Sequence, residues 1–358
     1  MTNKNIKEFL RINKNPQLEY KTIHILGTNG KGSTSYFLSQ LMEKNCKVGL
    51  YISPFTSNRF DNIYVQGKNI EEVNDYYKLY KSQFKKFGLS EFEEDTALAI
   101  IIFKLMDVKY AIFEVGIETS NDATNVILPD YTLITSTSLD HEDILGTNFK
   151  DIALNLSELF KEKSKIFVSR RIKKSIKNIY IKQAKKINSK IIFDKKIKNL
   201  KKYPYYQERN IELALKVFKE IFNEENVSLD DLKMLPFRFE KIKNNIIFDG
   251  AHNVEGVKLL VKTLIKLKIS PVVIFSSLNT KNFKEMTQVL IPSSKKIYVT
   301  TFDIKNSINI KQAKSIKGTE YLPKNKILDK LNESNRDIIL ITGSLYFLRE
   351  VRSMINEK

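Results

Sequence analysis

One segment constrains the fold of this chain more than any other, because it couples a strand to a glycine-rich turn and a helix. Residues 21–34 read K-T-I-H-I-L-G-T-N-G-K-G-S-T, and an apolar helical pattern follows them. Glycines allow backbone N–H groups to close around an anion, and a helix N-terminus adds its dipole. We therefore expect a phosphate-binding turn, and the residues predicted to contact phosphate are Thr28, Asn29, Gly30, Lys31, Gly32, Ser33 and Thr34.

The turn departs in two ways from the general pattern G-x-x-x-x-G-K-[ST], since it is shorter and has a glycine after the lysine. Lys31 is suited to the outer phosphates of a nucleotide, and the Ser33 hydroxyl can bind Mg²⁺. The alternative is an ordinary glycine-rich connection between a strand and a helix. The combination of glycines, lysine and hydroxyls in this context favours phosphate binding.

Length and composition indicate a folded protein of two domains. The chain has 358 residues, of which 42% are hydrophobic, and domains usually contain roughly 100–200 residues. A single cysteine, Cys46, excludes an internal disulfide and is typical of a reducing compartment. No signal peptide or membrane-spanning run is recognisable, so we expect a cytoplasmic protein without a membrane partner.

The formal net charge of +19 raises the question of a nucleic-acid partner. Lysines are scattered along the whole chain, however, and the densest basic run, residues 170–202, contains few aromatic residues and no nucleic-acid motif. A solvated lysine-rich surface explains the charge, and we expect no nucleic-acid partner.

Strand and helix patterns alternate through the first 235 residues. Strands are predicted at 47–52, 110–113, 131–135 and 165–168, and helices at 70–87, 96–106 and 151–163. This alternation is typical of a mostly parallel sheet covered by helices, whose ligands bind beyond the carboxyl ends of the strands. Four polar residues fall at those predicted ends: Lys31, Ser53, Glu114 and His141.

A second alternation begins after a predicted helix at 210–222 and a boundary at residues 235–236. Its strands are predicted at 246–248, 272–275, 297–300 and 338–341. We therefore expect an α/β protein, with a mostly parallel P-loop-type domain at 1–235 followed by a smaller Rossmann-like α/β domain at 236–358.

Several of these residues suit metal or nucleotide binding. A carboxylate ending a buried strand needs a partner, which for Glu114 is either Mg²⁺ shared with Ser33 or a structural ion pair. His141 is either a ligand at the same edge or an ordinary loop residue. His24 lies within the first strand, so we expect it in the core or just behind the site. In the second domain, Asp249 and His252 lie in a turn suited to ribose or phosphate.

Six motifs are spread over nearly the whole chain. They are G-T-N-G-K-G-S-T, E-V-G, D-A-T-N at 122–125, L-D-H at 139–141, D-G-A-H-N at 249–253 and T-G-S-L at 342–345. With these motifs in this order, the chain resembles the folylpolyglutamate synthase/dihydrofolate synthase family of the Mur ligase superfamily.

The resemblance implies an ATP-dependent carboxylate–amine ligase. Such an enzyme adds L-glutamate to dihydropteroate and/or reduced folates through an acyl phosphate, and releases ADP and phosphate. It also implies ATP and Mg²⁺ as one or two ions, with K⁺ as a further candidate, and a monomeric chain. Two alternatives stay open: a Mur-type ligase for a different acid and amine, and a catalytically degenerate ATP-binding regulatory protein.

The resemblance also implies roles for individual residues. Lys31 would stabilise the transferred phosphoryl group, Ser33 would hold one Mg²⁺, and Glu114 and His141 would hold a second metal ion. The implied nucleotide contacts are Asn210 near adenine, Arg238 at the phosphates, and Asp249 and His252 near the ribose and phosphates. The implied substrate contacts are Ser53, Phe92 and Asp122.

Two departures from the family pattern concern the metal and substrate sides. Leu156 stands where the family has a carbamylated lysine that helps to bind the second metal ion. Glu118, Thr119 and Ser120 replace the family's Gly-Gly-Arg. The sequence does not distinguish between adding the first glutamate, extending a glutamate tail, or both.

Overall fold

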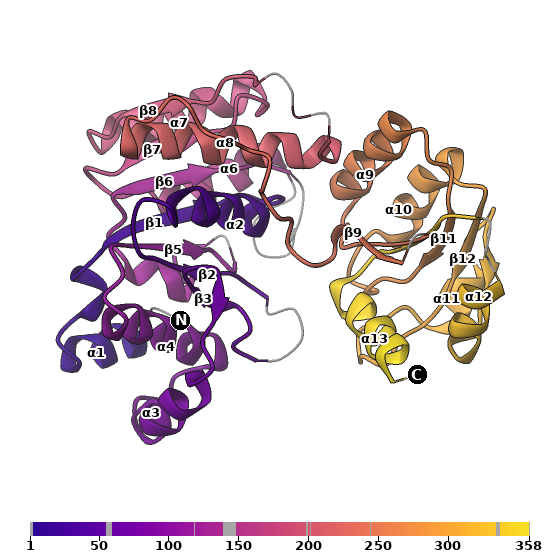
Figure 1. Cartoon of the computed structure of the whole chain (residues 1–358), viewed down its shortest axis with the longest axis horizontal. Helices are drawn as coiled ribbons and strands as arrows, with labels where there is room; N and C mark the ends of the chain where they lie inside the picture. Colours follow the sequence, from indigo (N-terminus) through magenta and orange to yellow (C-terminus); the bar gives the residue numbers. More distant parts are fainter. Residues whose placement is uncertain are drawn as a thin grey trace. The chain divides into compact units, whose positions relative to one another are not determined.

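The computed structural model describes residues 3–54, 59–117, 119–138, 148–197, 200, 202–243, 245–333 and 337–357. Its chain forms two compact units (Figure 1). The first contains Met1–Leu200 and Gln207–Lys233, and the second contains Lys201–Tyr206 and Met234–Lys358. Each is built from helices around a largely parallel sheet, which confirms the predicted α/β class. The assignment of residues 1–235 and 236–358 to functional domains stays a prediction.

The described part of the first unit contains an eight-stranded sheet of order β4-β3-β2-β5-β1-β6-β7-β8. The six neighbouring strands β2, β5, β1, β6, β7 and β8 are parallel to one another. Strands β3 and β4 form an antiparallel hairpin that extends the sheet at the β2 edge. Their bounds are β1 Lys21–Leu26, β2 Val48–Tyr51, β3 Ile63–Val65, β4 Lys68–Asn69, β5 Tyr110–Glu114, β6 Tyr131–Ile134, β7 Lys165–Val168 and β8 Ile191–Phe193.

Helices cover both faces of this sheet, which is why its central strands β1 and β5 are almost entirely buried. The helices are α1 Lys4–Ile12, α2 Lys31–Met42, α3 Val73–Phe87, α4 Glu91–Leu105, α6 Phe149–Glu158, α7 Lys174–Lys186 and α8 Tyr205–Phe222, with short 3₁₀ turns η1 Pro16–Leu18 and η2 Ala123–Val126. Two buried clusters fill one face, the first around α1 and α4 and the second around α6 and α7.

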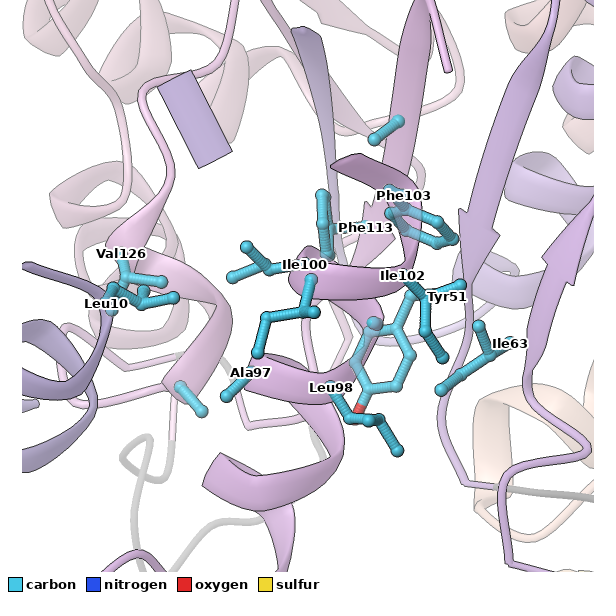
Figure 2. Close-up of a cluster of buried hydrophobic side chains, with 14 of the residues drawn as sticks. Leu10, Tyr51, Ile63, Ala97, Leu98, Ile100, Ile102, Phe103, Phe113 and Val126 are labelled. Atoms are coloured by element: carbon cyan, nitrogen blue, oxygen red, sulfur yellow. The ribbon is translucent and has the colours of Figure 1, made fainter. Parts of the chain in front are cut away.

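Figure 2 shows the first of these clusters, in which α4 residues lie against side chains from β2, β3 and β5. Tyr51, Phe103 and Phe113 are fully buried there. The helix begins at Glu91, five residues before the predicted start, because Ser90 caps it: the Glu93 N–H donates to Ser90 Oγ at 3.4 Å.

Other differences from prediction lie in polar or lysine-rich segments. Helix α6 ends at Glu158 rather than at residue 163, and both α7 and β8 lie in the basic run where no element was expected. Three apolar residues, Ile176, Tyr180 and Ala184, nevertheless bury one face of α7. Within the described residues, no helix is both long and apolar enough to span a membrane.

The second unit contains a six-stranded sheet, counted over its described residues, of order β13-β12-β11-β14-β10-β9. Among the strands described in this unit, only the edge strand β9 is antiparallel to its neighbour. The strands are β9 Arg238–Lys243, β10 Ile246–Asp249, β11 Val272–Phe275, β12 Lys296–Val299, β13 Glu320–Tyr321 and β14 Ile339–Thr342. The helices are α9 Val254–Leu267, α10 Phe283–Leu290, α11 Ile310–Lys314, α12 Ile327–Glu333 and α13 Leu345–Asn356, with 3₁₀ turns η3 Ile291–Ser293 and η4 Lys324–Lys326.

Candidate active site

The turn between β1 and α2 is fixed by the segment that follows β6, the neighbouring strand. Thr28 Oγ1 donates to the Ser138 carbonyl at 3.1 Å and accepts from the Ser138 N–H at 3.0 Å. The Asn29 N–H donates to Ser136 Oγ at 2.8 Å. Thr28 and Asn29, both predicted at the phosphates, therefore hold the turn in place with their own polar groups.

Two glycines of this turn adopt backbone conformations that other residues rarely take. The φ angles are +122° at Gly27 and +90° at Gly30. A Cβ atom at Gly27 would lie 2.4 Å from Thr135 Oγ1, and one at Gly30 would lie 2.4 Å from Asn210 Oδ1. Conformation and space both require glycine at these two positions.

Helix α2 begins directly after the turn, at the carboxyl end of β1. Within the described chain, no side chain caps its N-terminus. Its first backbone hydrogen bond runs from the Thr34 N–H to the Gly30 carbonyl at 2.9 Å, so the N–H groups of Gly32 and Ser33 lie ahead of it. Such a helix start attracts anions, and the partly buried Lys31 adds a full positive charge.

Two amide side chains of α8 contact this turn. Gln207 Nε2 donates to Ser33 Oγ at 3.2 Å, and Asn210 Nδ2 donates to Gln207 Oε1 at 2.8 Å. All three side chains are buried: the exposed fractions are 3% for Ser33, 0% for Gln207 and 7% for Asn210. The structure thus brings the predicted residues Ser33 and Asn210 together, with Gln207 between them.

Glu114 lies at the end of β5, beside β1 in the sheet. Its register partner on β1 is Ile25, two residues before Gly27. Glu114 is 5% exposed, and its Oε2 accepts from the Ser53 N–H at 3.0 Å. The predicted metal residue and the predicted substrate residue Ser53 are therefore direct neighbours at the carboxyl edge of the sheet.

The oxygen atoms at this edge fit a divalent cation carried by nucleotide phosphates. Mg²⁺ prefers oxygen ligands and commonly takes few of them from the protein, and Ser33 and Glu114 each offer one such group. Over the described residues, no group of three or more His, Cys, Asp or Glu side chains is arranged to hold a metal. Phosphate and water oxygens would therefore have to complete the coordination shell. His141, the remaining predicted ligand, lies outside the described residues, as does Glu118.

Leu156 packs in the hydrophobic core of the first unit. Its exposed fraction is 0%, and it belongs to the same cluster as Ile134 of β6 and Ile166 of β7. At the position where the resemblance implies a carbamylated lysine, α6 therefore contributes a core side chain.

The two remaining predicted substrate residues flank the chain that follows Glu114. Phe92 is partly buried, and a Cβ atom on Gly116 would lie 2.5 Å from its ring. Asp122 is 3% exposed, and its carboxylate accepts from the N–H groups of Ile117 at 2.6 Å and Thr124 at 2.9 Å. Asp122 thus holds the turn after β5, and its contact with substrate stays a prediction.

His24 is buried in β1, as its position in the predicted strand indicates, and it joins the Asp122 network. Its Nε2 lies 2.8 Å from Thr124 Oγ1, which donates to Asp122 Oδ1 at 2.5 Å. Because the Thr124 proton is used in that bond, His24 Nε2–H must be the donor. Burial lowers the pKa of His24 to about 3, so the imidazole is neutral.

Asp249 is the last residue of β10 in the second unit, and both of its carboxylate oxygens accept hydrogen bonds. Oδ2 accepts from Tyr206 Oη at 2.5 Å and from the Phe239 N–H at 3.0 Å, and Oδ1 accepts from the Ala251 N–H at 3.0 Å. Burial raises the pKa of Asp249, while the Tyr206 hydrogen bond and the charge of Arg238 oppose that rise. The carboxylate therefore fixes the turn that carries His252.

Arg238 and His252 lie beside this turn. Arg238 pairs in register with Asp249, and a Cβ atom on Gly250 would lie 2.3 Å from an Arg238 guanidinium nitrogen. His252 Nδ1 lies 2.9 Å from the Gly250 carbonyl and so donates to it, which fixes the orientation of the ring. The structure thus brings Arg238 of β9 beside the turn after β10 that contains Asp249 and His252.

Sequence reasoning did not assign a role in the site to Gln207 or Tyr206. Gln207 is buried and Tyr206 is half-buried, and each contacts a predicted residue, Ser33 and Asp249 respectively. The available signal for Gln207 was its position three residues before Asn210, since residues at that spacing share a helix face and both are buried. No sequence signal pointed to Tyr206.

Comparisons with known proteins identify the family. The Mur ligase middle domain family matches residues 25–255. The chain is 26% identical to folylpolyglutamate synthase of Lacticaseibacillus casei over 395 aligned positions, covering 95% of this chain and 91% of that protein. It is 28% identical to dihydrofolate synthase/folylpolyglutamate synthase of Bacillus subtilis, with the same coverages.

A solved structure shows the same fold. It is the bifunctional folylpolyglutamate synthase/dihydrofolate synthase of Yersinia pestis, complexed with AMPPNP and a manganese ion, and it superposes with a TM-score of 0.86. The alignment covers 99% of this chain and 94% of that one at 20% identity. The chain therefore belongs to the folylpolyglutamate synthase family of the Mur ligase superfamily.

Proposed function

We propose that the protein is an ATP-dependent ligase that adds L-glutamate to dihydropteroate, to reduced folates, or to both. The observation that carries this proposal is the start of α2, where Lys31 and Ser33 follow a glycine turn at the same sheet edge as Glu114. Full-length similarity to proteins named for this activity supports it.

The proposed reaction has two steps. A carboxylate oxygen of the pteridine substrate attacks the γ-phosphorus of ATP, the bond to ADP breaks, and an acyl phosphate forms. The amino group of glutamate then attacks the acyl carbon, loses a proton, and expels phosphate from a tetrahedral intermediate. The products are an amide, ADP and phosphate.

The residues at the turn suit the first step, because phosphoryl transfer depends mainly on positioning and on neutralising charge. The Gly32 and Ser33 N–H groups would orient the phosphates, and the Lys31 ammonium would stabilise charge on the transferred group. A bound Mg²⁺ would supply further charge neutralisation. Ser33 would hold it, and Glu114 with His141 would hold a second ion.

The remaining assignments are part of the same proposal. Asn210, Arg238, Asp249 and His252 would bind the nucleotide, while Ser53, Phe92 and Asp122 would bind the pteridine substrate. For Asp249 and Asp122, the observed hydrogen bonds support an orienting role toward neighbouring backbone. K⁺, a monomeric state and a cytoplasmic location also stay predictions.

Phosphate release provides the test. Purified protein is given ATP and Mg²⁺, with L-glutamate and either dihydropteroate or tetrahydrofolate, and the products are identified by mass spectrometry. We expect release that requires glutamate and at least one of the pteridines, and the active pteridine reveals which glutamate is added. Tight ATP binding without release in either mixture would refute the proposal and favour a different acid substrate or a regulatory protein.

A further inference from the structure

Gln207 occupies a specific place between the phosphate-binding turn and Asn210. We propose that Gln207 is a positioning residue that orients the Ser33 hydroxyl toward a divalent cation bound with the nucleotide. The inference rests on the proposed function only for the presence of a metal–nucleotide complex. It assigns to Gln207 a role in metal affinity, without contact between Gln207 and the metal.

The orientation of the Gln207 amide follows from its two partners. Asn210 presents Nδ2, a donor, at 2.8 Å, so the Gln207 oxygen must face it. The other half of the amide, Nε2, then points to Ser33 Oγ at 3.2 Å. Asn210 in turn lies with its Oδ1 against Gly30, where a Cβ atom would be only 2.4 Å away.

The hydrogen bond from Gln207 determines which lone pair of the Ser33 hydroxyl oxygen is left to bind a ligand. A hydroxyl has two acceptor lone pairs and one proton. One lone pair accepts from Gln207, so the second can bind a cation while the proton points elsewhere. Hydrogen bonds of this kind behind a metal ligand fix its direction, and removing them usually weakens metal binding about 10- to 100-fold.

Burial makes the effect specific to this side chain. Gln207 is 0% exposed and Ser33 is 3% exposed, so solvent has little access to replace a lost donor. Without Gln207, the Ser33 hydroxyl can rotate, and its lone pair no longer has a fixed direction. A purely space-filling role would predict no change in metal affinity when a side chain of similar size replaces Gln207.

The test compares Gln207→Met with a matched control on the same unit. Gln40 is also a glutamine that bridges helix α2 to another segment, donating to the Lys233 carbonyl at 3.0 Å and accepting from its N–H at 2.8 Å. Gln40→Met therefore removes comparable hydrogen bonds far along α2 from the turn. The probes are Mn²⁺ with AMPPNP, followed by the electron paramagnetic resonance of free Mn²⁺, and AMPPNP alone in EDTA, followed by calorimetry.

We expect Gln207→Met to raise the dissociation constant of Mn²⁺ in the AMPPNP complex about tenfold, with less than about a twofold change in metal-free AMPPNP binding. Gln40→Met should leave both constants unchanged. In a Ser33→Ala background, Gln207→Met should weaken Mn²⁺ binding no further, because the group that it orients is gone. Gln207→Asn, which keeps the amide but is too short to reach Ser33, should reproduce the loss if the methionine variant does not fold.

Any of these results with the variants would overturn the proposal: unchanged Mn²⁺ affinity in a folded variant, an undiminished effect in the Ser33→Ala background, or an equal loss of metal-free AMPPNP binding. Failure of the wild-type protein to bind Mn²⁺ with AMPPNP would also overturn it. Absence of glutamate-dependent phosphate release would instead refute the proposed function. The Mn²⁺ measurements do not depend on that outcome, so the two failures are distinguishable.

Discussion

Lowering the pH should reduce the stability of the first unit through His24, and the variant His24→Gln isolates this effect. The imidazole is fully buried in β1 and donates through Nε2 to Thr124. Glutamine can present an N–H at nearly the same place but does not titrate. The variant thus keeps the hydrogen bond and removes the buried base.

The size of the effect follows from the two pKa values. Burial lowers the pKa of His24 to about 3 in the folded chain, against about 6.5 in an unfolded chain. Between these values the unfolded state binds one more proton, so stability is present above pH 6.5 and is lost as the pH falls. From pH 7 to pH 5, the loss from this residue is about 2 kcal/mol.

Two aspartates act in the opposite direction and make the wild-type slope alone uninformative. Burial raises the pKa values of Asp95 and Asp194 to about 6. Their contribution to stability is therefore full below the unfolded value of about 4 and is lost as the pH rises through 6. The difference between wild type and His24→Gln cancels these terms.

Hydrogen exchange of the β1 amides is the suitable assay, because a chain of two units need not unfold in one step. Opening free energies are measured at pH 7 and pH 5 after correction for intrinsic exchange rates. The wild type should lose about 2 kcal/mol more than His24→Gln between these values. Equal losses would refute the reasoning, since they would mean that His24 binds no extra proton on unfolding. His252→Gln, in the second unit, serves as the control and should retain the wild-type slope.

Three further predictions concern single side chains. Lys31→Ala should lower phosphate release about 10²- to 10³-fold while changing the melting temperature little; wild-type turnover would remove Lys31 from the proposed chemistry. Gly30→Ala should weaken AMPPNP binding at least about tenfold in calorimetry, because a side chain at this positive φ meets Asn210 Oδ1 at 2.4 Å; undiminished affinity would show that the turn tolerates a Cβ. Leu156→Ala should destabilise the protein by about 2–5 kcal/mol in urea unfolding, whereas Leu79→Ala, at a 67% exposed position, should change stability by less than about 0.5 kcal/mol; similar effects at both sites would contradict the core placement of Leu156.

The elements that sequence analysis located well are those with a dense apolar pattern. Strand β7 has the predicted bounds of Lys165–Val168, and β1 ends at Leu26, directly before the glycine turn, as expected. Both are short runs that begin at a lysine and contain three apolar residues. In such runs burial of nearly every side chain and the local sequence favour the same structure.

The missed elements depend on interactions that local sequence does not reveal. Helix α7 is rich in lysine, and its few buried residues lie on one face that packs against the core. Strand β9 has four charged residues among its six, and it is stabilised by antiparallel pairing with β10 at an edge of the sheet.

In the candidate site too, residues with local chemistry could be predicted, and those defined by long-range contacts could not. Glycines, Lys31 and Ser33 could be assigned from one contiguous stretch, because their chemistry is local. The partners of Ser33 and Asp249 could not, since Gln207 is 174 positions from Ser33 and Tyr206 is 43 positions from Asp249. Only the folded chain shows that Asp122 bonds to backbone N–H groups and that Leu156 is a core residue.

The central claim is that a substrate carboxylate is activated as an acyl phosphate, and oxygen-isotope transfer tests it most directly. The active pteridine substrate is prepared with oxygen-18 in its reacting carboxylate and incubated with ATP, Mg²⁺ and L-glutamate. Mass spectrometry of the released phosphate should find one labelled oxygen for each amide formed, because the bond between that oxygen and the acyl carbon breaks in the second step. Unlabelled phosphate accompanying amide formation would contradict the account.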